Sequence, residues 1–187
     1  MKRLAGFVAI VVVTGAALSF GVGSAVAAGG TTCTTGSGQA KFSPGLSTTA
    51  SAENIVVKGT LTGCTGGTFT DAALLVHLPR GTALLTCDSL STGAPDLLSG
   101  RAVVQWLPAG SQSSMATVTA TLSGANTVHV TGVITVGSFT GLTLTTDLTL
   151  TAQLKTFPPG LKNPPAACSQ KNRLKNAAFS TSNFVVA

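Results

Sequence analysis

Residues 142–155, LTLTTDLTLTAQLK, alternate apolar and polar side chains over their whole length. The even-numbered positions are mainly leucine, and the odd-numbered positions are threonine, aspartate, glutamine and lysine. A period of two predicts a β-strand with one dry and one wet face, because successive side chains of a strand point to opposite sides. The same alternation occurs in residues 116–122, 55–61 and 128–131.

The rest of the chain after residue 28 follows the same plan. Further strands are expected near residues 38–43, 72–78, 82–87, 101–107, 132–137 and 177–186, and turns rich in Gly, Pro, Ser and Asn separate them. None of these segments has a convincing helical period. Many short strands with a turn about every ten residues predict an all-β fold. We expect an antiparallel β-sandwich, immunoglobulin-like or jelly-roll-like, with about 8–9 strands.

The N-terminus has the three-part order of a secretory signal peptide. Lys2 and Arg3 precede an uncharged apolar run that ends near Phe20, and small residues follow. We expect cleavage after Ala27, or after Ala28, so that residues 1–27 are a leader and residues 28–187 form one secreted domain. The alternative is a transmembrane anchor, but glycine and threonine interrupt the run, which barely reaches the ~20 residues that span a bilayer. The sequence thus predicts a secreted or envelope-associated protein.

Four cysteines in an exported chain predict two disulfides, and their spacing alone leaves three pairings open. If the strands near residues 38–43 and 54–62 form an antiparallel hairpin, its turn lies midway between Cys33 and Cys64. Those two cysteines then meet at the open end of the hairpin. The second disulfide would join Cys87 to Cys168.

The charge of the mature chain is mildly basic. Without Lys2 and Arg3 it keeps nine Lys and Arg against five Asp and Glu, a net charge of +4. A cluster near the C-terminus is a candidate anion-contact patch, and a solvated loop is the alternative. Its partner would be a cell-wall polymer, a lipid headgroup or another extracellular protein; nucleic acid is not expected, because aromatic residues and charge are both scarce. The patch consists of Lys162, Lys171, Arg173 and Lys175.

No catalytic motif stands out, so we expect no enzyme. Cys87-Asp88-Ser89-Leu90 resembles the Gly-Asp-Ser-Leu block of an esterase family, but the chain lacks the Asp-x-x-His that should follow. His77 and His129 are the only imidazoles that could act as a general base. His77 is expected to be a hydrogen-bonded residue at a strand end. His129 and Asp147 both lie on wet faces, where they form either a surface pair or two unrelated exposed side chains.

The sequence also contains little that indicates a cofactor site or a sugar-binding surface. Metal-ligand spacings, acidic calcium loops and phosphate-binding glycine loops are all missing from the sequence, so no cofactor is predicted. Trp106 is the single tryptophan and there is no tyrosine. Alternation places Trp106 beside Val104 and favours the core over a sugar-stacking surface. Residues 127–155 also read as two amphipathic strands around a turn, which makes a membrane-inserting pore-former one alternative.

Four segments resemble secreted proteins of unknown function from high-GC actinobacteria. The resemblance covers most of the mature chain, but its motifs are turns, cysteines and strand residues. It implies an extracellular β-sandwich and carries over no catalytic residue. Together these observations predict a non-catalytic binding module, with a pore-former or a secreted hydrolase as the alternatives. The four segments are Phe42-Ser43-Pro44-Gly45-Leu46, Gly59-Thr60-Leu61-Thr62-Gly63-Cys64-Thr65-Gly66, Val104-Gln105-Trp106-Leu107-Pro108-Ala109-Gly110-Ser111 and Gly137-Ser138-Phe139-Thr140-Gly141.

Overall fold

The computed structural model describes residues 29–81, 83–108, 113–152, 168 and 173–187. The predicted leader, residues 1–27, lies outside the described residues. Strands dominate the described part of the chain, and one short helix, α1 (Cys87–Thr92), lies between β5 and β6. The strands are β1 (Thr31–Leu46), β2 (Ser51–Ala52), β3 (Asn54–Thr65), β4 (Asp71–Leu78), β5 (Leu84–Leu85), β6 (Ala94–Leu107), β7 (Ser114–Gly124), β8 (Thr127–Val136), β9 (Thr143–Ala152), β10 (Leu174–Thr181) and β11 (Phe184–Val186).

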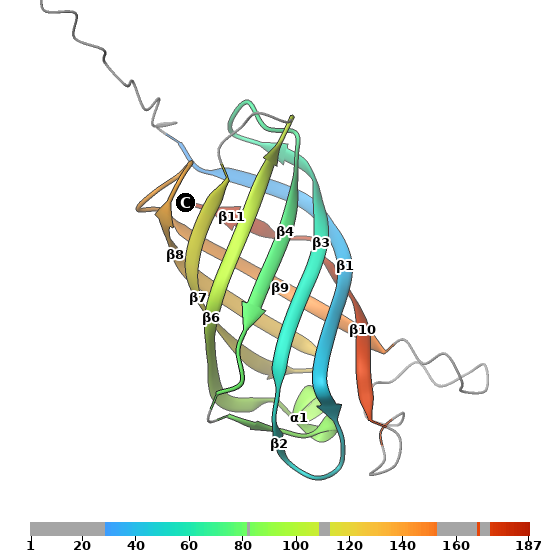
Figure 1. The fold of residues 1–187 in the computed structure, drawn as a ribbon. Helices are drawn as coiled ribbons and strands as arrows, with labels where there is room; N and C mark the ends of the chain where they lie inside the picture. The colour runs from blue at the N-terminus through green and yellow to red at the C-terminus, as the bar shows by residue number, and fades with distance from the viewer. Residues whose placement is uncertain (1–28, 82, 109–112, 153–167, 169–172) are drawn as a thin grey trace, which may run out of the picture.

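The long strands close into an eight-stranded antiparallel barrel (Figure 1). β1, β3, β4, β6, β7, β8 and β9 are neighbours in chain order, and β10 and β11 together fill the last position between β9 and β1. The prediction of a β-sandwich was therefore wrong. A period of two reports only that one face of each strand is buried. Pairing between the first and the last strands closes the sheet, and no local pattern encodes that pairing.

The dry face of each strand lines the inside of the barrel. In β9, Leu144, Leu148 and Leu150 are buried, whereas the intervening Thr145 and Asp147 face outward. Eight strands enclose an interior just wide enough for side chains to fill. Glycine makes room where a bulky ring enters: Gly38 and Gly59 are paired across β1 and β3, and a Cβ on either would lie 2.6 or 2.5 Å from the Phe179 ring.

An aromatic cluster fills the end of the barrel that is remote from α1. Trp106 is fully buried, and its ring centroid lies 5.3 Å from that of Phe69, 5.1 Å from Phe139 and 6.4 Å from Phe184. The indole Nε1–H donates to Ser114 Oγ at 2.8 Å. That hydroxyl in turn donates to the Ser138 carbonyl. The prediction that Trp106 belongs to the core is confirmed.

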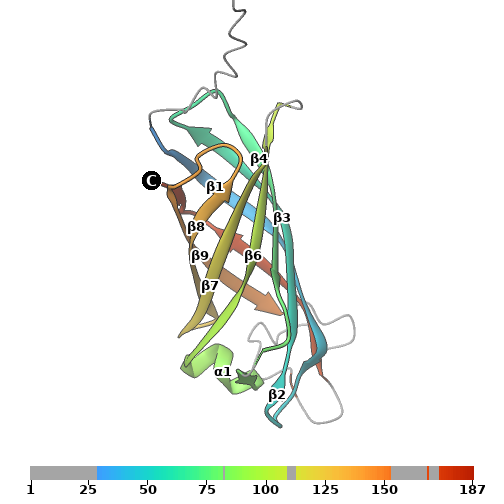
Figure 2. The same ribbon diagram turned by 60° about the vertical axis from the view of Figure 1, so that its left-hand side comes forward.

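The other end of the barrel is capped by α1 (Figure 2). The strand expected over residues 82–87 is only the two residues of β5, which pair with β2, and the chain then turns into the helix. Thr86 starts α1 as its N-cap: Thr86 Oγ1 accepts from Ser89 N, and Ser89 Oγ accepts from Thr86 N. A helix of six residues is too short to show a helical period, so the sequence pattern missed it.

Each end of the barrel carries one disulfide. Cys33 and Cys64 face each other across β1 and β3 and are joined, which is the pairing that the hairpin geometry predicted. Cys87, at the start of α1, is joined to Cys168. The register explains the first disulfide, because the pairs Ser43↔Asn54 and Cys33↔Cys64 belong to one uninterrupted hairpin.

Replacing Ser114 with alanine tests the aromatic end. Ser114→Ala should lower the free energy of unfolding by about 1–3 kcal/mol, because it leaves a buried indole N–H without an acceptor. Thr117→Ala, at an exposed position of the same strand, should change it by less than about 0.5 kcal/mol. Urea denaturation measures both, and equal effects would contradict the hydrogen bond.

The pairing of the cysteines gives a second prediction. Peptide mapping under non-reducing conditions should yield Cys33–Cys64 and Cys87–Cys168 peptides, and a Cys64–Cys87 peptide would overturn the pairing. Cys33→Ala/Cys64→Ala should lower the free energy of unfolding by about 3 kcal/mol, because the unfolded chain is no longer restricted.

Candidate functional site

The outward faces of β1, β3, β4 and β6 carry the strongest concentration of positive charge among the described strands. We call the surface formed by Lys41, Lys58, His77 and Arg101 the basic wall. All four side chains are exposed, and each occupies a polar position in the alternation of its strand. The four strands lie side by side across one side of the barrel (Figure 1). The basic wall is therefore a continuous surface built from segments far apart in the sequence.

The strand register sets the spacing of the basic wall. His77 lies directly opposite Arg101. Lys58 is opposite Leu75, and Val56 is opposite both Lys41 and His77, so Lys58 is the diagonal neighbour of the other two. Directly opposed residues have Cβ atoms about 5 Å apart, and diagonal neighbours are about 7–8 Å apart. The four nitrogen-bearing side chains thus form a staggered row across the strands.

Carboxylates are scarce near this row. Among the described residues, no Asp or Glu lies within ion-pair distance of Lys41, Lys58 or Arg101. Asp71 is on the same face of β4, but six residues from His77, which is ~20 Å along a strand. Its carboxylate accepts a hydrogen bond from Thr70 Oγ1 at 2.8 Å. Like charges on neighbouring strands repel one another, and no carboxylate among the described residues offsets them, so the basic wall has a positive potential.

Two shallow depressions flank the row. One, of about 340 Å³, lies among Lys41, Lys58 and Asn176, and the other, of about 550 Å³, lies among His77, Pro79 and Arg101. His77 is oriented by a 2.8 Å hydrogen bond between its Nε2 and Asn54 Oδ1. The prediction of a hydrogen-bonded histidine near a strand end is confirmed. Cationic side chains around open depressions suit an extended anionic ligand better than a small enclosed one.

The anion-contact patch expected at the C-terminus is described only in part. Lys162 and Lys171 lie outside the described residues. Arg173 and Lys175 are exposed and lie beside Gly45 near the α1 end of the barrel. The predicted patch consisted of charges that are close together in the chain. Lys41, Lys58 and Arg101 are far apart in the chain, and the strand register brings them together. Each of the three occupies a polar position of an expected strand, which is the one signal in the sequence that could have indicated them.

The surface pair of His129 with Asp147 is present. The two residues are directly opposed on β8 and β9, and His129 Nδ1 lies 2.7 Å from Asp147 Oδ1. Both side chains are well exposed, at 41% and 53%, and neither lines a pocket described for the barrel. The pair resembles the base and orienting acid of a hydrolase, yet no hydrogen bond links His129 to a serine or threonine hydroxyl among the described residues.

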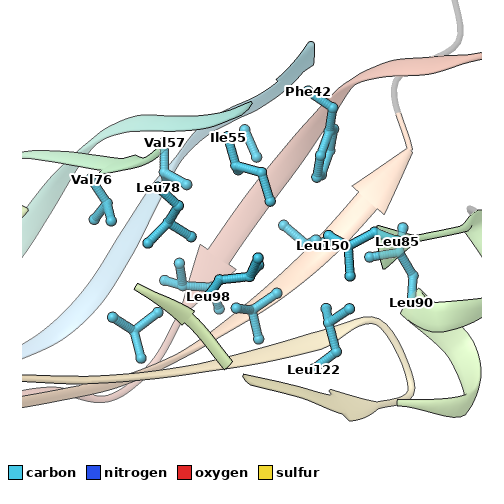
Figure 3. Close-up of a pocket in the computed structure, with 14 residues that line it drawn as sticks. Phe42, Ile55, Val57, Val76, Leu78, Leu85, Leu90, Leu98, Leu122 and Leu150 are labelled. Carbon is cyan, nitrogen blue, oxygen red and sulfur yellow. The ribbon is translucent and has the colours of Figure 1, made fainter. Parts of the chain in front are cut away.

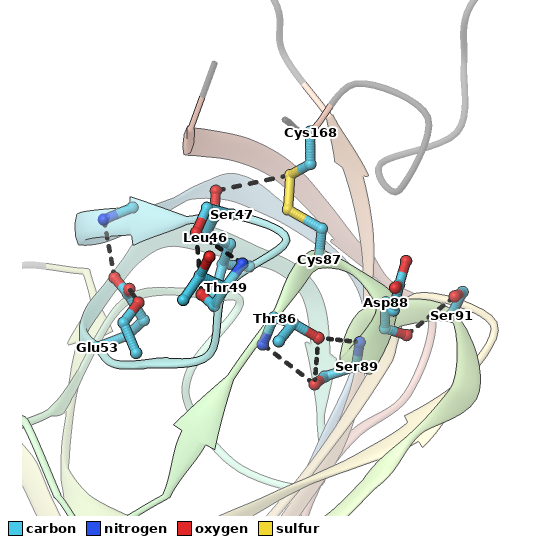
Figure 4. Close-up of a disulfide and its surroundings, with 12 residues drawn as sticks. Leu46, Ser47, Thr49, Glu53, Thr86, Cys87, Asp88, Ser89, Ser91 and Cys168 are labelled. Atoms are coloured by element: carbon cyan, nitrogen blue, oxygen red, sulfur yellow. Dashed lines mark hydrogen bonds between the residues drawn. A yellow bond between two sulfur atoms is a disulfide. The ribbon is translucent and has the colours of Figure 1, made fainter. Parts of the chain in front are cut away.

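The Cys87-Asp88-Ser89-Leu90 segment serves the architecture of the cap (Figure 4). Ser89 closes the capping box of α1, and Cys87 is disulfide-bonded to Cys168. Leu90 is buried, at 1% exposure. Close by, the buried carboxylate of Glu53 accepts from Gly45 N at 2.9 Å and from Ser51 Oγ at 2.7 Å. Ser89 thus caps a helix and Glu53 stabilises a turn, so the structure gives each of them an architectural role.

No group of three or more His, Cys, Asp or Glu residues in the described part of the chain is placed so as to hold a metal ion. No helix in the described ranges has the length and apolar character needed to cross a bilayer. Comparison of the chain with family models, curated protein sequences and solved structures finds no match.

The exposure of the His129–Asp147 pair predicts a small energetic contribution. Asp147→Asn should change the free energy of unfolding by less than about 1 kcal/mol, because water screens an exposed ion pair. Urea denaturation at low and high salt measures this change.

A secreted hydrolase would in addition require that His77→Ala/His129→Ala abolish an activity found in a screen of extracellular substrates.

Proposed function

We propose that this chain is a secreted, non-catalytic binding module that holds an anionic cell-envelope polymer against its basic wall. The observation that carries the proposal is the set of cationic side chains on neighbouring strands without carboxylate partners among the described residues. The signal-peptide order of the N-terminus supports secretion. The two disulfides support an oxidising compartment, because they persist outside the cytoplasm.

The spacing of the row suits a polymer that carries about one negative charge per repeat. Neighbouring cations about 5–8 Å apart can each meet a separate phosphate or carboxylate group. Each exposed contact contributes little, on the order of 1 kcal/mol or less, so useful affinity needs several contacts at once. A polymer supplies them together, whereas a single small anion does not.

The pore-forming alternative would need a different arrangement of side chains. A membrane-spanning barrel presents an apolar band to lipid and a polar interior. Here the interior is apolar, and the outward positions of β7, β8 and β9 are largely threonine. Met115, Val133 and Val136 are exposed apolar residues on the outside of β7 and β8, whereas most other outward positions of these strands are threonine. Release of dye from liposomes is the direct test of the pore-former.

The basic wall gives a matched pair of variants. Lys58→Gln/Arg101→Gln should weaken binding to immobilised polyphosphate about tenfold, since each lost contact is worth about 0.7 kcal/mol. Arg173→Gln/Lys175→Gln removes the same charge at the α1 end and should change the affinity less than about twofold. Surface plasmon resonance at two salt concentrations measures both, with neutral dextran as the control polymer. Equal loss in the two variants, or equal binding to dextran, would contradict the proposal.

A further inference from the structure

The interior of the barrel has two unlike halves. Toward one end the aromatic cluster around Trp106 packs closely and uses its one polar atom in a hydrogen bond. Toward α1 the lining is aliphatic apart from Phe42, and a cavity of about 30 Å³ remains (Figure 3). All fourteen lining residues are apolar. A cavity without polar groups stays dry, so anything that occupies it must be apolar.

The floor of this cavity does not belong to the barrel. Leu85 from β5 and Leu90 from α1 reach into it, and each is only 1% exposed (Figure 3). These two leucines fill space that the strands alone would leave open. If the cap moved outward, both side chains would leave the barrel, and the apolar half would become a deep, open-ended pocket.

The cap, formed by β5 and α1, makes few backbone hydrogen bonds to the rest of the chain, although its leucines are buried. Its backbone bonds to the barrel loops are Cys87 N to Ser47 O at 3.0 Å, Ala125 N to Ser91 O at 3.0 Å and Asn126 N to Leu90 O at 2.7 Å. β2 and β5 add two residue pairs. β2 and β5 form a sheet of their own, so the strand pairing of the barrel does not depend on the cap and would be kept if the cap moved outward. The Cys87–Cys168 disulfide joins the start of α1 to the C-terminal part of the chain (Figure 4).

Charge at this end points to the polar part of an occupant. Arg173 and Lys175 are exposed beside Gly45, three residues after the cavity-lining Phe42. The exposed acids described on or near this half are Asp88 on α1 and Asp147 on β9, and Asp147 is already paired with His129. Glu53 is also close, but its carboxylate is buried and accepts from Gly45 N and Ser51 Oγ. A negative headgroup would therefore meet cations when its chain enters at this end.

We propose that the aliphatic half of the barrel binds the single alkyl chain of a fatty acid, with the carboxylate outside near Arg173 and Lys175. The existing cavity accommodates only about two water-sized spheres. It is therefore the first part of the space that the alkyl chain would occupy and not the whole of it. A longer chain takes the space that Leu85 and Leu90 vacate. A thin unbranched chain fits a small barrel better than a ring system, because the interior of eight strands is narrow. The inference is independent of polymer binding at the basic wall.

Dodecanoate is the probe, and dodecyltrimethylammonium, with the same chain and the opposite charge, is the comparison. Calorimetric titration of the mature, disulfide-bonded protein should show saturable one-to-one binding of dodecanoate, about tenfold tighter than that of the cationic amphiphile. Methyl resonances of Val128 and Val130, which line the cavity, should shift on binding. Equal affinity for the two amphiphiles, or shifts confined to outward valines such as Val133, would overturn the proposal.

Two substitutions locate the site inside the barrel. Ala40→Val adds bulk to the cavity lining and should weaken dodecanoate binding about tenfold, whereas Ala178→Val, at an outward position of β10, should leave it unchanged. Leu90→Ala removes a side chain that fills part of the barrel interior. Dodecanoate should therefore raise the melting temperature of this variant more than that of the parent protein. Leu84→Ala, at an exposed position of β5, is its control. If Leu90→Ala does not fold, the comparison of Ala40→Val with Ala178→Val still tests the location of the site. Equal dodecanoate binding by these two variants would refute the site.

Discussion

Pairing of β1 with β10 and β11 is the constraint on which the rest of the structure depends. The first strand of the described chain forms hydrogen bonds with β3 on one side and with the last two strands on the other. Without the pairing of β1 with β10 and β11, the sheet would have two long unpaired edge strands, which are prone to pair with other chains. With it, the apolar faces of all strands meet in one interior, and a second sheet is not needed to cover them.

Closure also determines where recognition takes place. The dry faces are turned inward, so the outer surface consists of the side chains at the alternate positions. On β7, β8 and β9 these are mainly threonines, while on β1, β3, β4 and β6 they include Lys41, Lys58, His77 and Arg101. The barrel thus has one side rich in hydroxyls and one side rich in cations. The scarcity of charged residues in the chain, 9% overall, makes the cations on one side more conspicuous.

The two ends of the barrel are stabilised in different ways. One end is filled by Trp106 and neighbouring rings and is linked by the Cys33–Cys64 disulfide between adjacent strands. The other end is closed by α1 and β5, which lie outside the ladder and are held by the Cys87–Cys168 disulfide. Local openings of a protein start where few ladder bonds and few packed side chains resist them. The α1 end has few ladder bonds, although Leu85 and Leu90 are buried there, and it is also the end where a cavity remains.

Sequence alone determined the features that depend on neighbouring residues or on one hairpin. Alternation identified the strands of residues 116–122 and 142–155, of which 143–152 form β9 and 153–155 lie outside the described residues. It also placed Trp106 in the core, and the symmetry of one hairpin matched Cys33 with Cys64. Only the tertiary structure decided that the sheet closes into a barrel, that residues 87–92 form a helix and that Lys41, Lys58 and Arg101 share one wall. The reason is physical: a period of two fixes which face of a strand is buried, but the partner and register of each strand arise from contacts between residues far apart in the chain.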